Sequence, residues 1–423
     1  MATNFKVTEL DFDQIKKNLK NYLKTQSTFN DYDFEGSGMS VLLDVLAYNT
    51  HYNAMAAHFS LNEAFLDSAQ IRGNVVSRAR LLGYTPRSKL ASRAVVNIAV
   101  TGFTGDQASN NPANLTLARG TQLVTTVGGR EFSFVVLSAD NATIDSVTNK
   151  YTFNNVEIAE GTLKTLKFRV DNDLTNQKYQ ISDKDADTST MRVRVQANDL
   201  SSAFDIYTKY TTLLNVDAAT RIFHLQENAN EYYEVFFGDG VIGARPQSNN
   251  IVTLDYVYTN GKDVNGATNF GMGSNVNIGQ FSASAVSISL VSKSTGGADR
   301  ETLESIRYNA PLTFTSQNRA VTTDDYRAII QREFSDIDAI STWGGEDNDP
   351  PDYGSVYVCV KPVQNETLTD AQKNTIKNTI LKGKNVVSIT PVMVDPNYTY
   401  LELDVFFKYN NNLTDRSASD LLS

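Results

Sequence analysis

The spacing of the apolar residues changes near residue 91, and this change constrains the fold more than any other feature of the sequence. Before it, apolar residues recur every three or four positions, as they do along one side of a helix. After it, short stretches rich in β-branched residues, such as Ala94–Val100, are separated by Gly, Asn, Asp and Thr, which is typical of strands. The sequence therefore predicts an α+β multidomain protein whose helical segment precedes β-rich domains.

The N-terminal segment predicts three helices. Phe12 to Leu23 has helical spacing with Asp11 as N-cap, Met39 to Phe59 forms the second helix, and Asp67 with Gln70 opens the third, which Gly83 ends. The second helix carries apolar residues on most sides, and such a helix should be covered on most sides. The other helices of this segment are few and short, so we expect its cover to come from other chains.

The middle of the chain predicts short strands in two β-rich blocks. These strands span 94–100, 122–126, 132–137, 166–170, 192–196, 221–225, 232–237 and 251–258. Residues 182–189 are polar or small and predict a loop between the blocks, and residues 261–298 predict loop and linker. Gly238, Asp239 and Gly240 follow a strand and predict a tight structural turn, in which at least one glycine takes a positive φ.

The last third predicts a small α+β domain. Its helices are a short one near Leu303 that stops before Pro311, one capped at Thr322 or Thr323, and one opened by a capping box of Thr369 with Gln372. Its strands span 339–343, 355–361 and 386–394. A further strand at 398–409 alternates cleanly, with Leu401, Leu403, Val405 and Phe407 on one face.

These patterns predict five segments along the chain. They are 1–90 (helical, forming an intersubunit bundle), 91–181 (first β-rich domain), 182–298 (second β-rich domain with the turn), 299–397 (α+β domain) and 398–423 (the start of a further region). The apolar face of the 398–409 strand needs something packed against it. We therefore expect the native polypeptide to continue past Ser423, or another chain to cover this edge.

Composition excludes several classes of partner and site. Lys plus Arg total 38 against 48 Asp plus Glu, a net charge of −10 that argues against general nucleic-acid binding and against an anionic membrane surface. No run of 18 apolar residues predicts a membrane span. The single cysteine, Cys359, excludes an internal disulfide and zinc sites built on several cysteines, and its apolar strand predicts a buried, unreactive thiol.

The candidates for chemistry have simpler structural interpretations. The sequence has no phosphate loop, GxSxG elbow or HExxH motif. His51 and His58 lie two helical turns apart without a third ligand, and we favour packing or surface histidines over a metal site. Asp347, Asp349 and Asp352 offer oxygens to a hard cation, but two prolines interrupt them, so we favour an exposed, metal-free loop over a calcium site. The sequence thus predicts no enzyme activity, cofactor or metal.

Two stretches resemble a known family. They are DYDFEGSGMSVLLDVLAYNTHYNAM (31–55) with SRARLLGYTPRSKLASRA (77–94), and FFGDGVIGARPQSNNIVTLDYVYTNGKDVNGA (236–267). Both are similar to the baseplate J-like family, the baseplate wedge subunits of contractile-tailed bacteriophages, and most of all to the gene-six type of T-even phages. The resemblance runs over nearly the whole chain and contains no catalytic motif. Members of the T-even type are longer than this chain.

The resemblance implies a structural role in the virion. It implies a homodimer that joins a larger wedge subunit through a bundle of N-terminal helices, with further wedge, hub and sheath-initiator proteins as partners. Such wedges form the inner ring around the hub and pass its rearrangement to the contractile sheath, after assembly in the host cytoplasm. The residues we expect in the bundle interface are Leu42, Val45, Leu46, Tyr48, Tyr52, Met55 and Phe59.

Two alternatives stay open from the sequence. A tail-associated cell-wall or polysaccharide hydrolase would need a pair of carboxylates in a cleft, which distant residues can supply in space. A receptor-binding module built as a trimeric fibre would show repeats or heptads, and we find neither in the sequence. Co-purification with wedge proteins, hydrolytic activity alone, or glycan binding alone would distinguish the three.

Overall fold

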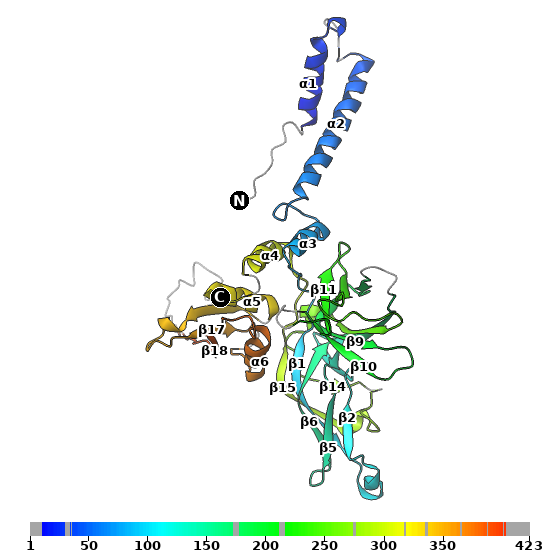
Figure 1. Ribbon diagram of the computed structural model, residues 1–423, viewed down its shortest axis with the longest axis vertical. Coiled ribbons are helices and arrows are strands. Elements are labelled where there is room, and N and C mark those ends of the chain that lie inside the picture. Colours follow the sequence, from blue (N-terminus) through cyan, green and yellow to red (C-terminus); the bar gives the residue numbers. More distant parts are fainter. Residues whose placement is uncertain are drawn as a thin grey trace, which may run out of the picture.

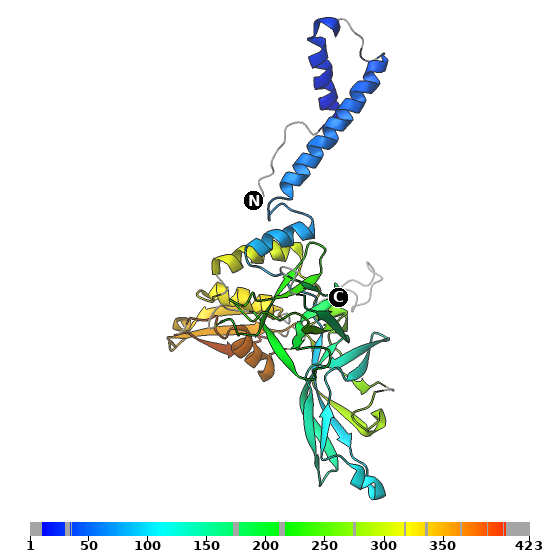
Figure 2. The same ribbon diagram turned by 45° about the vertical axis from the view of Figure 1, so that its right-hand side comes forward.

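The computed structural model describes residues 11–29, 34, 36–171, 177–210, 216–273, 276–316, 319–334, 337–363, 366–386, 388–400 and 402. A helical arm projects from a β-rich body, and a small domain of helices and strands lies beside that body (Figures 1 and 2). The predicted fold class, a helical segment followed by β-rich domains and a small α+β domain, is therefore confirmed.

Three helices form the arm and its base. They are α1 (Phe12–Lys24), α2 (Gly38–Asn62) and α3 (Arg72–Leu81). The predicted cap of α1 is confirmed, since the Asp11 side chain accepts a hydrogen bond from the Gln14 N–H at 2.8 Å. The predicted start of α3 at Asp67 is wrong. Gln70 and Ile71 give their N–H groups to the carboxylate of Glu63, and α3 begins only after them.

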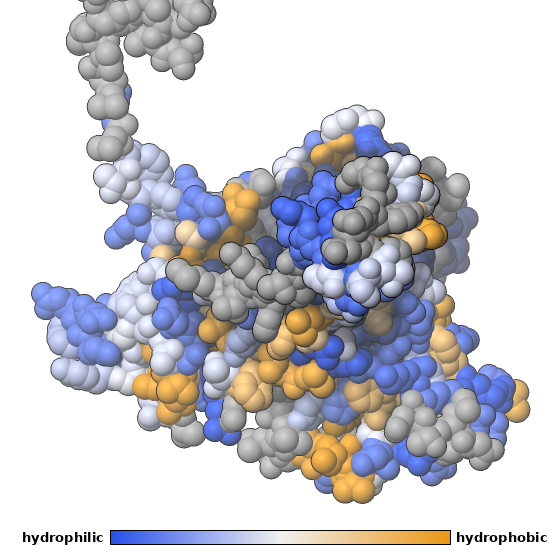
Figure 3. All heavy atoms as spheres, turned by 90° about the horizontal axis from the view of Figure 1, so that it is seen from above, coloured by the Kyte–Doolittle hydropathy of each residue, from blue (hydrophilic) through white to orange (hydrophobic). Residues whose placement is uncertain are grey.

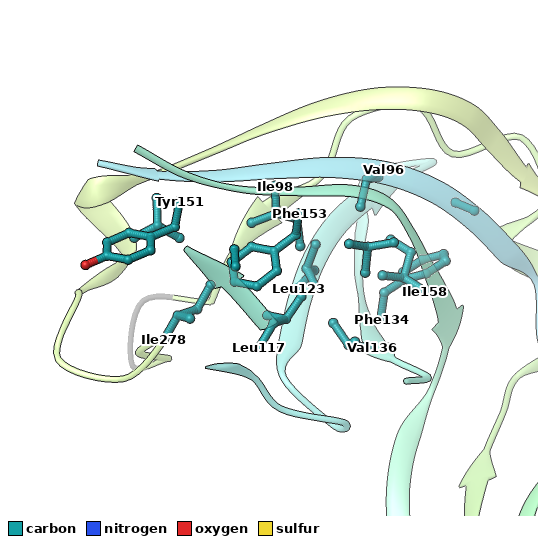
Figure 4. Close-up of a cluster of buried hydrophobic side chains, with 14 of the residues drawn as sticks. Val96, Ile98, Leu117, Leu123, Phe134, Val136, Tyr151, Phe153, Ile158 and Ile278 are labelled. Carbon is teal, nitrogen blue, oxygen red and sulfur yellow. The ribbon is translucent and has the colours of Figure 1, made fainter. Parts of the chain in front are cut away.

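The first sheet holds eight strands in the order β14-β3-β4-β6-β1-β15, with β5 pairing β6 and β2. Their bounds are β1 (Arg93–Thr101), β2 (Asn114–Leu117), β3 (Gln122–Val127), β4 (Arg130–Val136), β5 (Asp140–Asp145), β6 (Lys150–Glu160), β14 (Gly271–Met272) and β15 (Val286–Thr295). Its core brings together Val96, Ile98, Leu123, Phe134 and Phe153, which come from four strands and point toward one another (Figure 4).

The second sheet has the order β7-β13-β9-β10-β11-β12-β8. Its strands are β7 (Thr162–Arg169), β8 (Tyr179–Gln180), β9 (Ala186–Gln196), β10 (Phe204–Lys209), β11 (Ile222–Glu227), β12 (Tyr233–Phe237) and β13 (Ile251–Tyr258). The sheet curls around its core, because Phe168 of the edge strand β7 contacts Tyr179 of the opposite edge strand β8, with ring centroids 5.5 Å apart. Each of the eight strands predicted for the middle of the chain overlaps an observed strand.

Two predicted loops are wrong. The 182–189 loop is partly strand, because β9 begins at Ala186 and the buried Asp187 accepts the Ala91 N–H at 2.9 Å. The 261–298 linker contains β14 and the ten-residue β15, which pairs with β1 along its length. The two sheets also do not divide at residue 181, since β7 and β8 belong to the second sheet and β15 returns to the first. The five-segment division as a statement about domains stays a prediction.

The remaining elements are α4 (Leu303–Ser316) and the small domain: α5 (Thr323–Glu333), β16 (Ala339–Gly344), β17 (Ser355–Lys361), α6 (Asp370–Thr375) continued by a π-helical turn (Ile376–Ile380), and β18 (Thr390–Val394). Five short 3₁₀ helices lie at Ser27–Phe29, Gly105–Asn110, Gly261–Val264, Ala283–Ala285 and Gly345–Asp347. The capping box predicted at Thr369 is confirmed, and of the two threonines predicted to cap α5, Thr322 is the N-cap. The stop before Pro311 is wrong, because α4 runs through this proline while Ile306 and Ala310 pack in the cluster shared with α3.

The sheet of the small domain has the order β16-β17-β18. Val356, Val358 and Val360 of β17 pack against the helices, so Cys359 projects from the opposite face and is half-buried rather than buried. Burial, and secondarily the charge of Asp395, raise the pKa of its thiol. The predicted strand at 398–409 lies outside the described residues at position 401 and from position 403 onward.

Candidate assembly surface on the helical arm

Helix α1 covers only one side of α2. Ile15 of α1 is buried, and on α2 the buried residues are Leu43 and Ala47, one helical turn apart and on the same side. An ion pair between Lys16 and Asp44 joins the two helices at this contact. The rest of the 25-residue α2 therefore depends on something other than α1 for cover.

The seven residues predicted for an intersubunit interface are all exposed in the isolated chain. Their exposed fractions range from 46% for Phe59 to 60% for Val45; the others are Leu42, Leu46, Tyr48, Tyr52 and Met55. Seen from above, orange hydrophobic residues reach the surface at several places between blue hydrophilic ones (Figure 3). A contiguous apolar surface of this kind on one helix marks an interaction site.

Part of this surface forms a regular seam. Val41 is also exposed, and the spacing along α2 is then four, three, four, three and four residues; the seam comprises Val41, Val45, Tyr48, Tyr52, Met55 and Phe59. This is the a/d spacing of a coiled coil. At 100° per residue the seam faces away from Leu43 and Ala47, and so away from α1. This heptad pattern is not evident in the sequence, because Leu42, Leu43 and Leu46 stand between the seam residues. The exposed fractions of the side chains are needed to distinguish it.

Two tyrosines lie at the middle of the seam. The hydroxyl oxygens of Tyr48 and Tyr52 are 3.0 Å apart, and their ring centroids are 4.6 Å apart. The hydrogen bond to Tyr52, and then its charge, raise the pKa of Tyr48. Together with Val45, Leu46 and Asn49 these rings line a shallow depression. Paired aromatic rings with polar tips are common at protein interfaces, where the rings are buried and the hydroxyls find partners.

The base of α2 is held by a carboxylate. Glu63, which follows α2, accepts hydrogen bonds from the N–H groups of Gln70 at 2.8 Å and Ile71 at 3.3 Å, and from the side chain of Asn74 at 2.8 Å. Burial opposes ionisation of this carboxyl, but these hydrogen bonds lower its pKa overall. Negative charge at a helix N-terminus is favourable, so Glu63 fixes the turn between the arm and α3.

A buried charge network then joins α3 to the body. The side chain of Arg72 binds both oxygens of Glu227 on β11, at 2.9 and 3.1 Å, and Arg300 binds the same carboxylate at 3.0 Å. The Glu227 side chain is fully buried, so two cations compensate one desolvated anion. Tyr84 donates to the carboxylate of Glu301 at 2.6 Å in the same junction. Helix α3 thus fixes the arm to the body, whereas the apolar residues of α2 beyond this junction are exposed.

The turn at Gly238–Gly240 has a backbone geometry that requires glycine. Gly240 has φ +90°, which confirms the expectation of a positive φ, and a Cβ on Gly238 would lie 2.2 Å from the carbonyl oxygen of Ile242. Asp239, between the two glycines, does not take a positive φ. Its carboxylate instead accepts the N–H groups of Ile242 and Val241, each at 2.9 Å, and these bonds lower its pKa.

The other candidates remain separate from one another. In the described part of the chain, no group of three His, Cys, Asp or Glu side chains is arranged to hold a metal ion. His51 and His58 are half-exposed on α2, and Asp347, Asp349 and Asp352 are exposed in their loop. None of the helices in the described ranges combines the length and apolar character that a membrane span requires.

Two segments of the chain match family models of known proteins. Residues 11–84 match the helical domain described as baseplate wedge protein gp6-like, and residues 322–394 match C-terminal domain I of baseplate structural protein gp6. The chain is 29% identical to the baseplate wedge protein gp6 of Enterobacteria phage T4, over 96% of its own length and 62% of that relative. The chain therefore spans less than two thirds of this curated relative.

One solved structure also aligns with this chain. A chain of the anti-feeding prophage baseplate aligns with 93% of this chain and 81% of its own length, at 14% identity and a TM-score of 0.30. The segment that carries the seam lies within the matched helical domain.

Proposed function

We propose, from the premise that this chain is a relative of the baseplate wedge protein gp6, that it is a structural subunit of a phage tail baseplate wedge and not an enzyme. The observation that carries the proposal is the uncovered seam of α2, which lies inside the matched helical domain. A seam with a/d spacing fits helices of other chains, because knobs on one helix need holes on another.

The proposed partners follow from the same surface. The arm pairs with a second copy of the chain and with a helix of a larger wedge subunit, so that a helical bundle covers α2. Hub and sheath-initiator proteins complete the surroundings, and the subunit forms part of the inner ring and passes its rearrangement to the sheath. The particle is the site of action, and assembly takes place in the host cytoplasm. The contact between Arg72 and Glu227 supports this role, because it fixes α3 to the body, so that a movement of the arm can be passed to the body.

A charge-insertion experiment tests the proposal. Val45→Asp combined with Tyr52→Asp places two carboxylates in the seam, and burying them in a bundle would cost about 3 kcal/mol or more. We expect folded chain that no longer co-purifies with co-expressed neighbouring tail proteins. Leu42→Asp with Leu46→Asp tests the flank of the seam in the same way.

A matched control separates charge from position. Thr50 is exposed on α2 and points about 180° away from the seam, so Thr50→Asp adds a charge to the same helix on the side opposite the seam. Helical circular dichroism should be equal in all variants. Normal co-purification of the seam variant, or equal loss in the control, would show that α2 is not the assembly surface.

The alternative functions have no specific observation in their favour. The curated relative is named as a baseplate wedge protein. Hydrolysis of cell-wall polysaccharide by the purified chain alone would revive the hydrolase interpretation.

A further inference from the structure

The outer face of the second sheet gathers positive charge in a chain whose net charge is −10. Arg192 and Arg194 on β9 are two residues apart and therefore project from the same face. Lys167 on β7 shares this face, because Lys167 and Arg194 are both paired with Thr253 of the strand between them. Arg119 reaches the same region and donates to the carbonyl oxygen of Thr190 at 2.7 Å. We call Arg119, Lys167, Arg192 and Arg194 the basic face.

The basic face is under-compensated. Its carboxylate is Asp255 of β13, which is 5% exposed and accepts hydrogen bonds from Arg194 and Thr165, each at 2.7 Å. Within the described ranges, Arg119, Lys167 and Arg192 form no ion pair. Burial, and then the charges of Arg192 and Arg194, lower the pKa of Arg119, against the opposing effect of Asp255. Four cations thus face one carboxylate whose two oxygens are already bonded.

An apolar strip lies beside these cations. Phe204 and Ile206 of β10 are 41% and 46% exposed. The guanidinium carbons of Arg192 and Arg194 lie 5.6 and 5.2 Å from the centroid of the Phe204 ring. This cation–π contact holds both arginines in place over one ring, which reduces the side-chain entropy lost when they bind a ligand. The face therefore offers oriented charge next to exposed apolar surface.

We propose that the basic face binds an acidic segment of another protein chain, with at least two carboxylates on Arg192 and Lys167 and an apolar side chain against Phe204 and Ile206. Guanidinium groups recognise carboxylates through paired hydrogen bonds, which gives the contact direction as well as attraction. A protein segment fits better than nucleic acid, because the chain as a whole repels a phosphate backbone while the strip needs an apolar partner. Strands β9 and β10 lie in the body, away from the arm (Figure 1), so this surface is distinct from the seam of α2.

Direct binding of a defined probe tests the proposal. The probe is a fluorescent peptide of alternating Glu and Leu, titrated with the full chain at about 0.15 M salt, where long-range attraction between exposed charges is screened. Arg192→Gln with Lys167→Gln removes two of the three cations that form no ion pair and leaves the pair of Arg194 with Asp255 intact. We expect about tenfold weaker binding, the loss of roughly 1.4 kcal/mol of binding free energy.

A matched control and a competing ligand decide the outcome. Arg130 lies over the ring of Phe132 at 6.0 Å, which is the same contact on the other sheet, so Arg130→Gln should change binding less than about twofold. The proposal is overturned if wild-type chain does not bind the peptide, if both variants weaken binding equally, or if duplex DNA of equal charge binds as tightly. Thermal unfolding of each variant checks that the fold is kept. Because the seam of α2 is unchanged in these variants, failure here leaves the wedge proposal standing.

Discussion

The base and the free length of the helical arm differ in how far their side chains are covered by the chain itself. At its base the buried carboxylate of Glu227 is compensated, since Arg72, Arg300 and Tyr233 surround it. Along its free length, by contrast, the seam of α2 leaves half of each side chain in water. The base is completed by residues of this one chain, whereas the seam leaves exposed apolar side chains, which the proposed bundle would cover.

The largest expected effect is at the base. Glu227→Gln removes the anion between two buried arginines and should lower the free energy of unfolding by about 3–5 kcal/mol, the usual cost of breaking a buried pair. Denaturant unfolding of the purified chain measures this loss. Glu157→Gln is the control, because its pair with Arg93 is exposed and should change stability by less than about 1 kcal/mol. Equal effects of the two variants would contradict the assigned role of the network.

A second prediction compares two faces of α2. Leu43 is buried against α1, so Leu43→Ala should destabilise the arm of the isolated chain by about 2–3 kcal/mol. Val45 is 60% exposed on the seam, and Val45→Ala should cost less than about 0.5 kcal/mol in the isolated chain. In the assembled complex Val45→Ala should weaken association, as measured by the concentration at which the complex dissociates. A seam that stays insensitive in the complex would show that the bundle covers another face.

The sequence predicted the parts of the fold that depend on local chemistry. The caps at Asp11, Thr322 and Thr369 are formed by residues three positions apart, and β17 was placed at its observed bounds. Strand β6 was missed because its polar sequence is interrupted by Asn155, which has φ +55° and marks a change of register. The missed strand β15 alternates with serine and is specified by pairing with β1, nearly two hundred residues away.

The candidate functional surfaces were also predictable only where one continuous stretch of sequence forms them. The exposed apolar residues of α2 were predicted, because an over-apolar helix is visible in one stretch of sequence. The basic face was not, because Lys167 and Arg192 are brought together only by the register of the second sheet, and Arg119 reaches them from the segment between β2 and β3. The charge network at Glu227 was missed for the same reason: Arg72 lies 155 positions before Glu227 and Arg300 lies 73 positions after it, so no local pattern joins them.

A third prediction concerns the turn after β12. Gly240→Val forces a β-branched residue to φ +90° and should lower the free energy of unfolding by about 1 kcal/mol or more. Asp239→Asn keeps the oxygen that accepts both N–H groups, so the melting temperature should change little. Asp239→Ala removes that acceptor and should fall between the two. Loss of a measured hydrolytic activity in Asp239→Asn, with the fold intact, would disprove the structural interpretation of this turn.

The smallest expected effect is a pH dependence at the elbow between the arm and its base. The pKa of Glu63 is lowered in the folded chain, so its hydrogen bonds contribute stability above the unfolded pKa of about 4.3. That contribution should be lost as pH falls through the lower folded value, because protonation removes the charge that Gln70 and Asn74 bind. Glu63→Gln should flatten the stability profile below about pH 4.5, while Glu304→Gln, at an exposed carboxylate, should leave it unchanged. Thermal unfolding between about pH 3 and 6 measures both profiles, and a Glu63→Gln profile parallel to wild type would show that this carboxylate does not hold the elbow.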